Sequence, residues 1–66
     1  MGLSSNIKKI RSKRKLSQKD VASALGVVQG CVANWEAGSR EPRLSDLSRL
    51  AGVLGVSVSE LTGITI

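Results

Sequence analysis

A run of basic side chains near the start of the chain could bind a polyanion through its positive charge. Seven of the ten Lys and Arg residues lie within residues 8–19, "KKIRSKRKLSQK", which contain no acid. Such a cluster indicates either a polyanion partner or a solvated face. Binders of single strands and of RNA stack unpaired bases on exposed aromatic side chains, and Trp35 is the only aromatic residue here. A nucleic-acid partner would therefore be a duplex.

The sequence lacks the residues that disulfides, metal sites and catalysis usually require. The sequence has no histidine and one cysteine, Cys31, which excludes an internal disulfide and the usual kinds of zinc site. A lone cysteine is more typical of a small buried side chain than of a redox switch. There is neither a Gly-rich phosphate loop nor an obvious pair of acids. We expect no enzyme, no cofactor, no metal and no small-molecule ligand.

The length of 66 residues fits one domain over residues 1–66, which would bury only about 60% of its unfolded surface. No apolar run approaches the roughly 18 residues of a membrane span. The N-terminus lacks the apolar core of a signal peptide, and a single cysteine suits a reducing compartment. These features favour a cytoplasmic location, at the nucleoid if the partner is DNA, and no membrane partner.

Apolar side chains recur with helical spacing over most of the chain and predict five short helices. The first covers residues 5–14 and places Ile7, Ile10, Arg11 and Arg14 on one face. The second covers residues 18–25, after a sequence, Ser17 to Asp20, that resembles a capping box, and Gly26 ends it. The third covers about residues 29–37, with Val32 and Trp35 inside, and ends at Gly38. The fourth carries the apolar stripe Leu44, Leu47, Leu50, Ala51 and Leu54.

A full capping box, Ser57 to Glu60, begins a last short helix that Gly63 closes. We therefore expect a compact all-α fold of five helices. Residues 26–28 form a three-residue turn between the second and third helices, which is typical of a helix-turn-helix. The third helix contains poor helix formers, since Gly30 weakens a helix by roughly 1 kcal/mol relative to Ala.

The segment "LSQKDVASALGVVQGCVANWEAG", followed by Pro42 and "LSDLSRLAGVLGVSVSELTG", resembles the lambda-repressor-like (Xre/Cro/CI) helix-turn-helix family over nearly the whole chain. The resemblance implies a sequence-specific transcriptional regulator, of the phage or prophage repressor type, that binds a pseudo-palindromic operator in double-stranded DNA. It also implies that the third helix enters the major groove. An antitoxin or another protein-interaction module of the same fold remains the alternative.

The resemblance implies a set of base-contacting residues on the third helix. Gln29 takes the place of the main base reader, and its amide could bond adenine at two positions. Asn34 is expected on roughly the same outward face. Val28 replaces the usual capping Ser or Thr, and it could either contact a thymine methyl or pack in the core. Gly30 could let the backbone approach the bases or be a merely tolerated residue, and Ala33 could add an apolar contact.

The resemblance also implies a set of residues that contact the DNA backbone. Its members are Gln18, Ser17, Lys19, Arg40, Arg43 and Arg11, of which Ser17 is better explained as a cap. Arg11 is further expected to form an ion pair with Glu36, which would tie the first helix to the third. Lys8, Lys9, Lys13 and Lys15 are expected to contribute to the electrostatic field rather than to specific bonds.

One such domain reads only a few base pairs, and two half-sites about 34–36 Å apart give useful specificity. Together with the resemblance, which implies binding as a dimer, this leads us to expect a homodimer, formed on DNA even where it is weak in free solution. Candidate contact residues are the apolar side chains near the C-terminus, Val56, Val58, Ile64 and Ile66, which could equally be a packed last helix and a frayed end.

Overall fold

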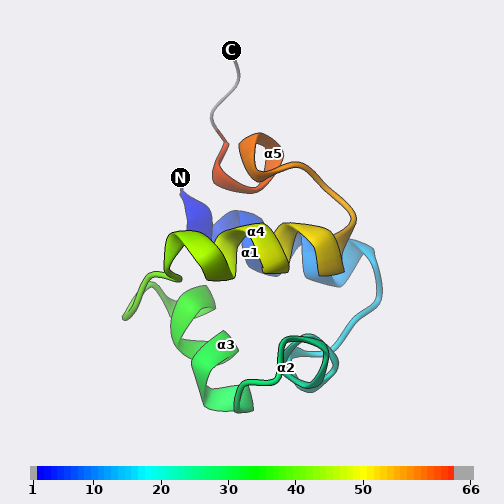
Figure 1. Ribbon diagram of the computed structural model, residues 1–66, viewed down its shortest axis with the longest axis vertical. Helices are drawn as coiled ribbons and strands as arrows, with labels where there is room; N and C mark the ends of the chain where they lie inside the picture. The colour runs from blue at the N-terminus through cyan, green and yellow to red at the C-terminus, as the bar shows by residue number, and fades with distance from the viewer. Residues whose placement is uncertain (1, 64–66) are drawn as a thin grey trace.

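The computed structural model describes residues 2–63, which form five α-helices and contain no strand (Figure 1). The helices are α1 (Leu3–Lys13), α2 (Gln18–Leu25), α3 (Gln29–Ala37), α4 (Leu44–Leu54) and α5 (Val58–Thr62). The predicted all-α fold is confirmed. Of the expected dimer residues, Ile64 and Ile66 lie outside the described residues.

The two capping boxes predicted from the sequence are formed by hydrogen bonds in the structure. The Ser17 hydroxyl accepts from the Asp20 N–H at 2.9 Å, and the Asp20 carboxylate accepts from the Ser17 N–H at 2.9 Å. Ser57 and Glu60 exchange the equivalent pair at 3.1 and 3.2 Å. Each box satisfies helix N–H groups that have no partner within the helix, and so fixes where α2 and α5 begin.

The core is built from all five helices. Its ten buried apolar residues are Ile7, Val21, Ala22, Leu25, Val32, Trp35, Leu50, Ala51, Leu54 and Leu61. α1 contacts α3 and α5, α2 contacts α3 and α4, and α4 contacts α5. As a result, α2 and α3 lie at one end of the molecule and α5 lies at the other (Figure 1).

Several details differ from the sequence-based expectations. α1 spans Leu3–Lys13 rather than residues 5–14, and its cap residue Gly2 forms no side-chain bond that the sequence could have signalled. Leu44, expected on the apolar stripe, is 76% exposed because it begins α4 outside the helix packing. Cys31 is half-buried against the core instead of fully buried. Within residues 2–63, no helix is long and apolar enough to cross a membrane.

Candidate nucleic-acid interface

α3 presents one face to the core and the opposite face to solvent. Val32 is fully buried and Trp35 is 4% exposed. Because successive residues turn by about 100° around a helix, the side directly away from these two carries a different set of positions. This outward face consists of Gly30, Ala33, Asn34 and Ala37, all exposed except the half-buried Ala33. Ala37 was missed in the sequence analysis, although its spacing of three and four residues from Asn34 and Ala33 was available as a signal.

The two amide side chains expected to read bases are both exposed, but they do not share one face. Gln29 and Asn34 are five residues apart, which places them about 140° apart around α3. They lie on the two flanks of the outward face, which corrects the expectation that they point the same way. Between them runs a ridge of Gly30, Ala33 and Ala37, which we call the small-residue ridge. No side chain along this ridge is longer than a methyl group.

Packing within the domain explains neither Val28 nor Gly30 at the start of α3. Val28 is the N-cap, makes no side-chain cap bond and is 75% exposed, so core packing does not account for it. A Cβ atom added to Gly30 would meet no atom within 4 Å, and Gly30 does not have the positive φ that favours glycine. The protein itself therefore gives no steric reason for glycine at this position.

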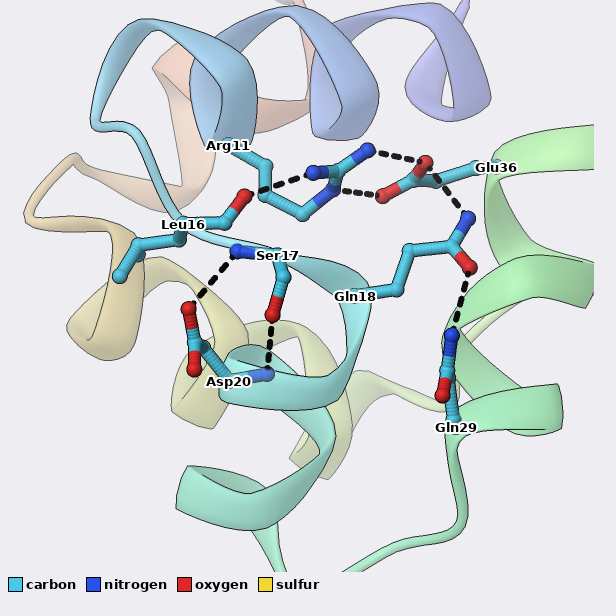
Figure 2. Close-up of polar contacts among 7 residues, drawn as sticks. All are labelled: Arg11, Leu16, Ser17, Gln18, Asp20, Gln29 and Glu36. Carbon is cyan, nitrogen blue, oxygen red and sulfur yellow. Dashed lines mark hydrogen bonds and ion pairs between the residues drawn. The ribbon is translucent and has the colours of Figure 1, made fainter.

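A nearly buried ion pair joins α1 to the end of α3 (Figure 2). Arg11 Nε lies 2.5 Å from Glu36 Oε2, and Arg11 Nη2 lies 3.0 Å from Glu36 Oε1. The side chains are 13% and 4% exposed. Arg11 Nη1 also donates to the Leu16 carbonyl at 2.6 Å, so the same guanidinium holds the turn between α1 and α2. A two-point pair of this kind fixes the orientation of both side chains.

The polar chain continues from Glu36 to the outward surface. Gln18 Nε2 donates to Glu36 Oε1 at 3.1 Å, and Gln29 Nε2 donates to Gln18 Oε1 at 3.5 Å (Figure 2). The last bond is long and exposed, and is therefore weak. Gln18 thus orients the Gln29 side chain through one bond, and the rest of the Gln29 amide is exposed to solvent.

Charge at this junction favours the ionised forms of both partners. Burial raises the pKa of Glu36, but hydrogen bonds from Arg11 and Gln18, together with the charges of Arg11 and Lys8, outweigh it and lower the pKa. The hydrogen bond to Glu36 is the main cause of the raised pKa of Arg11. The junction is therefore a charged structural unit at neutral pH.

Three of the residues expected to contact phosphates are exposed, one on α2 and two in the loop between α3 and α4. Lys19 is in the first turn of α2, Arg40 follows α3, and Arg43 is the N-cap of α4. All three are exposed, and within residues 2–63 their side chains form no hydrogen bond or ion pair. Arg14 and Arg49 differ, because they donate to the carbonyls of Gly55 and Leu25 respectively.

Ser17, Gln18 and Arg11, also expected at phosphates, have bonds within the protein. Ser17 caps α2, and the Gln18 side chain bridges Glu36 and Gln29. Each nitrogen of the Arg11 guanidinium already donates to Glu36 or to Leu16, which leaves the side chain 13% exposed. These contacts favour a positioning role for Arg11.

Comparison with known proteins places this geometry in a family. The helix-turn-helix family model matches residues 7–61. The transcriptional repressor RstR of the cryptic phage CTXphi, from Vibrio cholerae, is 36% identical over 58 residues, which make up 88% of this chain and 52% of that protein. The curated relatives that match are named as transcriptional regulators or repressors, and the chain spans about half of their length.

Two solved structures show the same fold. The restriction-modification controller protein C.AhdI from Aeromonas hydrophila has a TM-score of 0.85 and 27% identity, with 89% of each chain covered. Hydroxypropylphosphonic acid epoxidase from S. wedmorenis has a TM-score of 0.84 and 38% identity, but the likeness covers 91% of this chain and only 32% of that chain. With the family model matching most of its length, the chain belongs to the helix-turn-helix family, of the lambda-repressor-like (Xre) type.

Proposed function

We propose that this chain is a sequence-specific, double-stranded-DNA-binding regulator that inserts α3 into the major groove. The observation that carries the proposal is the outward face of α3, where the small-residue ridge is flanked by the exposed amides of Gln29 and Asn34. The major groove is wide enough to admit an α-helix. A ridge without long side chains would let the backbone of α3 come close to the base edges.

The base contacts divide between the two flanks and the ridge. Gln29 would bond adenine at N6 and N7, and Asn34 would reach a base or a phosphate on the other flank. The methyl group of Ala33 suits a thymine methyl. Val28, which is 75% exposed at the start of α3, would make a similar apolar contact. Gly30 would contribute close approach rather than a bond.

The backbone contacts come from the exposed cations and from the start of α2. Lys19, Arg40 and Arg43 would neutralise phosphates on the two sides of α3. The backbone N–H of Gln18 begins α2, where a phosphate is favoured by the helix dipole, whereas the N–H of Ser17 is already taken by the Asp20 carboxylate. We assign the Arg11 side chain to the ion pair alone, since its nitrogens donate inside the protein. Phosphate contacts set affinity, and base contacts set sequence preference.

Regulation would follow from occupancy of an operator by two copies. The names of the relatives, which include a phage transcriptional repressor, support a repressor of the phage or prophage type, and a DNA-binding repressor would act at the nucleoid. Two domains on a pseudo-palindromic site would block or recruit RNA polymerase. Val56 and Val58 are half-buried at the α4–α5 turn, and α5 lies at the opposite end from α2 and α3. A dimer contact there would leave α3 free for DNA.

The test is selection of bound sites from a random duplex library, followed by titration of the selected and random duplexes across a salt series. We expect a motif with two half-sites about 34–36 Å apart, and log affinity that falls linearly with log salt. Negligible binding to every duplex at low salt would overturn the proposal and favour a protein-interaction module such as an antitoxin.

Two variants distinguish base contacts from phosphate contacts in the same assay. Gln29→Ala is expected to flatten base preference while sparing affinity for random duplexes. Arg43→Ala is expected to weaken all duplexes alike and to reduce the salt slope by about 1. If Gln29→Ala lowers the affinity for selected and random duplexes equally, Gln29 is not a base reader.

A further inference from the structure

The turn after α1 holds a residue in an unfavourable backbone conformation. Among residues 2–63, Lys15 is the only non-glycine with positive φ, at 58°. Gly26, Gly38 and Gly55 hold the corresponding positions after α2, α3 and α4, with φ values of 73°, 80° and 71°. Side chains with a Cβ atom are disfavoured in this region, whereas glycine enters it freely.

The hydrogen bonds show that these four turns are the same motif. In each, the residue after the left-handed one donates its N–H to the carbonyl five positions earlier, as in a Schellman C-cap. The four bonds are Leu16 to Arg11 at 3.1 Å, Val27 to Ala22 at 3.0 Å, Ser39 to Asn34 at 3.1 Å and Val56 to Ala51 at 3.0 Å. Glycine would serve equally well after α1, so Lys15 destabilises a turn that the chain builds from glycine elsewhere.

The fold does not use the charge of Lys15. The residue is exposed, and within the described part of the chain its ammonium group makes no hydrogen bond or ion pair. Lys8, Lys9, Lys13 and Lys19 are also exposed, but they lie in regular helix, which lysine favours. Lys15 is therefore the one lysine of the basic run whose presence works against the local backbone.

The turn that carries Lys15 is held in a defined position relative to α3. The carbonyl of Leu16, the next residue, accepts from Arg11, and Arg11 is bound to Glu36 on α3. Lys15 and Lys19 stand on either side of Ser17 and Gln18 in the chain. An ammonium group at this turn is thus presented from a fixed base beside the proposed DNA-backbone contacts.

We infer that Lys15 is a phosphate-contacting residue, which revises the sequence-based expectation that it contributes only to the electrostatic field, and that its charge accounts for a lysine in a glycine position. The inference rests on the proposed function and adds to it an anchoring contact with no base preference. A phosphate is the ligand because it is the group that duplex DNA presents regardless of sequence.

The experiment compares two substitutions that each replace a lysine by a neutral amide. Lys15→Asn keeps a residue that tolerates positive φ. Lys9→Gln is the matched control, because Lys9 is two residues from Arg11 in α1 and so points away from Glu36 and α3. Affinity for a random duplex is measured across a salt series, and folding is checked by circular dichroism and Tm.

Lys15→Asn is expected to reduce the salt slope by about 0.9, so that the loss of affinity between about 50 and 200 mM salt becomes about 3.5-fold smaller. Lys9→Gln should change the slope much less, and Lys15→Arg should keep the wild-type slope. Lys15→Gly should reduce the salt slope by the same amount. It should also raise Tm by about 4–8 °C, because glycine removes the cost of a side chain at positive φ.

Two results separate the inference from the proposed function. If wild-type protein binds DNA and Lys15→Asn changes the slope no more than Lys9→Gln does, the contact by Lys15 is overturned and the proposed function stands. If wild-type protein fails to bind any duplex, the proposed function is overturned and the inference falls with it.

Discussion

Gln18 donates from Nε2 to Glu36 Oε1 at 3.1 Å, so the first side chain of α2 is held by the carboxylate that also pairs with Arg11. Glu36 is the junction of three helices, because Arg11 lies on α1, Gln18 on α2 and Glu36 itself on α3. Gln29 then bonds to Gln18. The orientation of the proposed base reader is therefore linked to an ion pair that does not face the DNA.

Glu36→Gln should lower the stability of the domain. The substitution preserves shape but leaves the nearly buried Arg11 without its counter-charge, and we expect a loss of about 3 kcal/mol in the free energy of unfolding. Urea denaturation measures the loss. Asp46→Asn is the control, because Asp46 lies 3.6 Å from the half-exposed Arg49 and such pairs contribute about 0–1 kcal/mol. Equal losses in the two variants would contradict the central place given to Glu36.

The stability of the domain should fall in acid because of the same carboxylate. Burial opposes ionisation of Glu36, yet the bonds from Arg11 and Gln18 lower its pKa below the ordinary 4.5. The unfolded chain therefore binds the proton more readily, and stability rises with pH in this range. The contribution is complete above about pH 4.5 and is lost as pH falls through the lower pKa of the folded state.

Denaturation of the wild type and Glu36→Gln from pH 7 to pH 3 checks this dependence. The variant should show a shallower loss of stability in acid. A residual slope is expected from Asp20, whose pKa is lowered chiefly by the bond from the Ser17 N–H. Parallel curves for the two proteins would contradict the assignment to Glu36.

The helices could be predicted because short sequence signals near each end determine where a helix begins and stops. Capping boxes at Ser17 and Ser57 and glycines such as Gly26 act within one helical turn, so α2 and α3 match the predicted bounds. The start of α1 was missed because Gly2 gives no capping signal. Leu44 was misplaced because helical spacing shows which residues share a face, but not how far a neighbouring helix covers it.

The residues of the candidate site could be predicted from the sequence, but the side-chain contacts among them could not. Resemblance pointed to Gln29 and Asn34, and their spacing of five residues on a helix with the predicted bounds already places them on opposite flanks. The bridge from Glu36 through Gln18 to Gln29 depends on side-chain rotamers and on contacts between distant parts of the chain. Neither is encoded in a local pattern.

Val28→Thr should stabilise the protein. Valine cannot accept a hydrogen bond at the N-cap of α3, whereas threonine can, and we expect a gain of about 1 kcal/mol in the free energy of unfolding. Nothing is lost in the core because Val28 is 75% exposed. Thermal unfolding measures the gain. Val28→Ser supplies the same cap without a methyl group. Of the two variants, only Val28→Ser should therefore weaken a preference for thymine. Destabilisation by threonine would show that Val28 packs against the protein.

Gly30→Ala should stabilise the free domain and impair its binding to DNA. A Cβ atom at Gly30 meets nothing within 4 Å, and the same is true of Gly52, an exposed glycine in α4. Alanine at either position should add about 0.5–1 kcal/mol to the free energy of unfolding, because it restricts the unfolded chain and favours helix. Gly52→Ala is therefore a control matched in chemistry and in local structure.

The two alanine variants should differ only against DNA. If the small-residue ridge lies against the base edges, the new methyl group of Gly30→Ala stands where the groove must fit, and we expect about a tenfold loss of affinity for the selected operator, or about 1.4 kcal/mol. Gly52→Ala should bind as the wild type does. Wild-type affinity in Gly30→Ala, together with the expected gain in stability, would mean that α3 does not approach the bases at Gly30. The glycine there would then be a tolerated weakness of the helix.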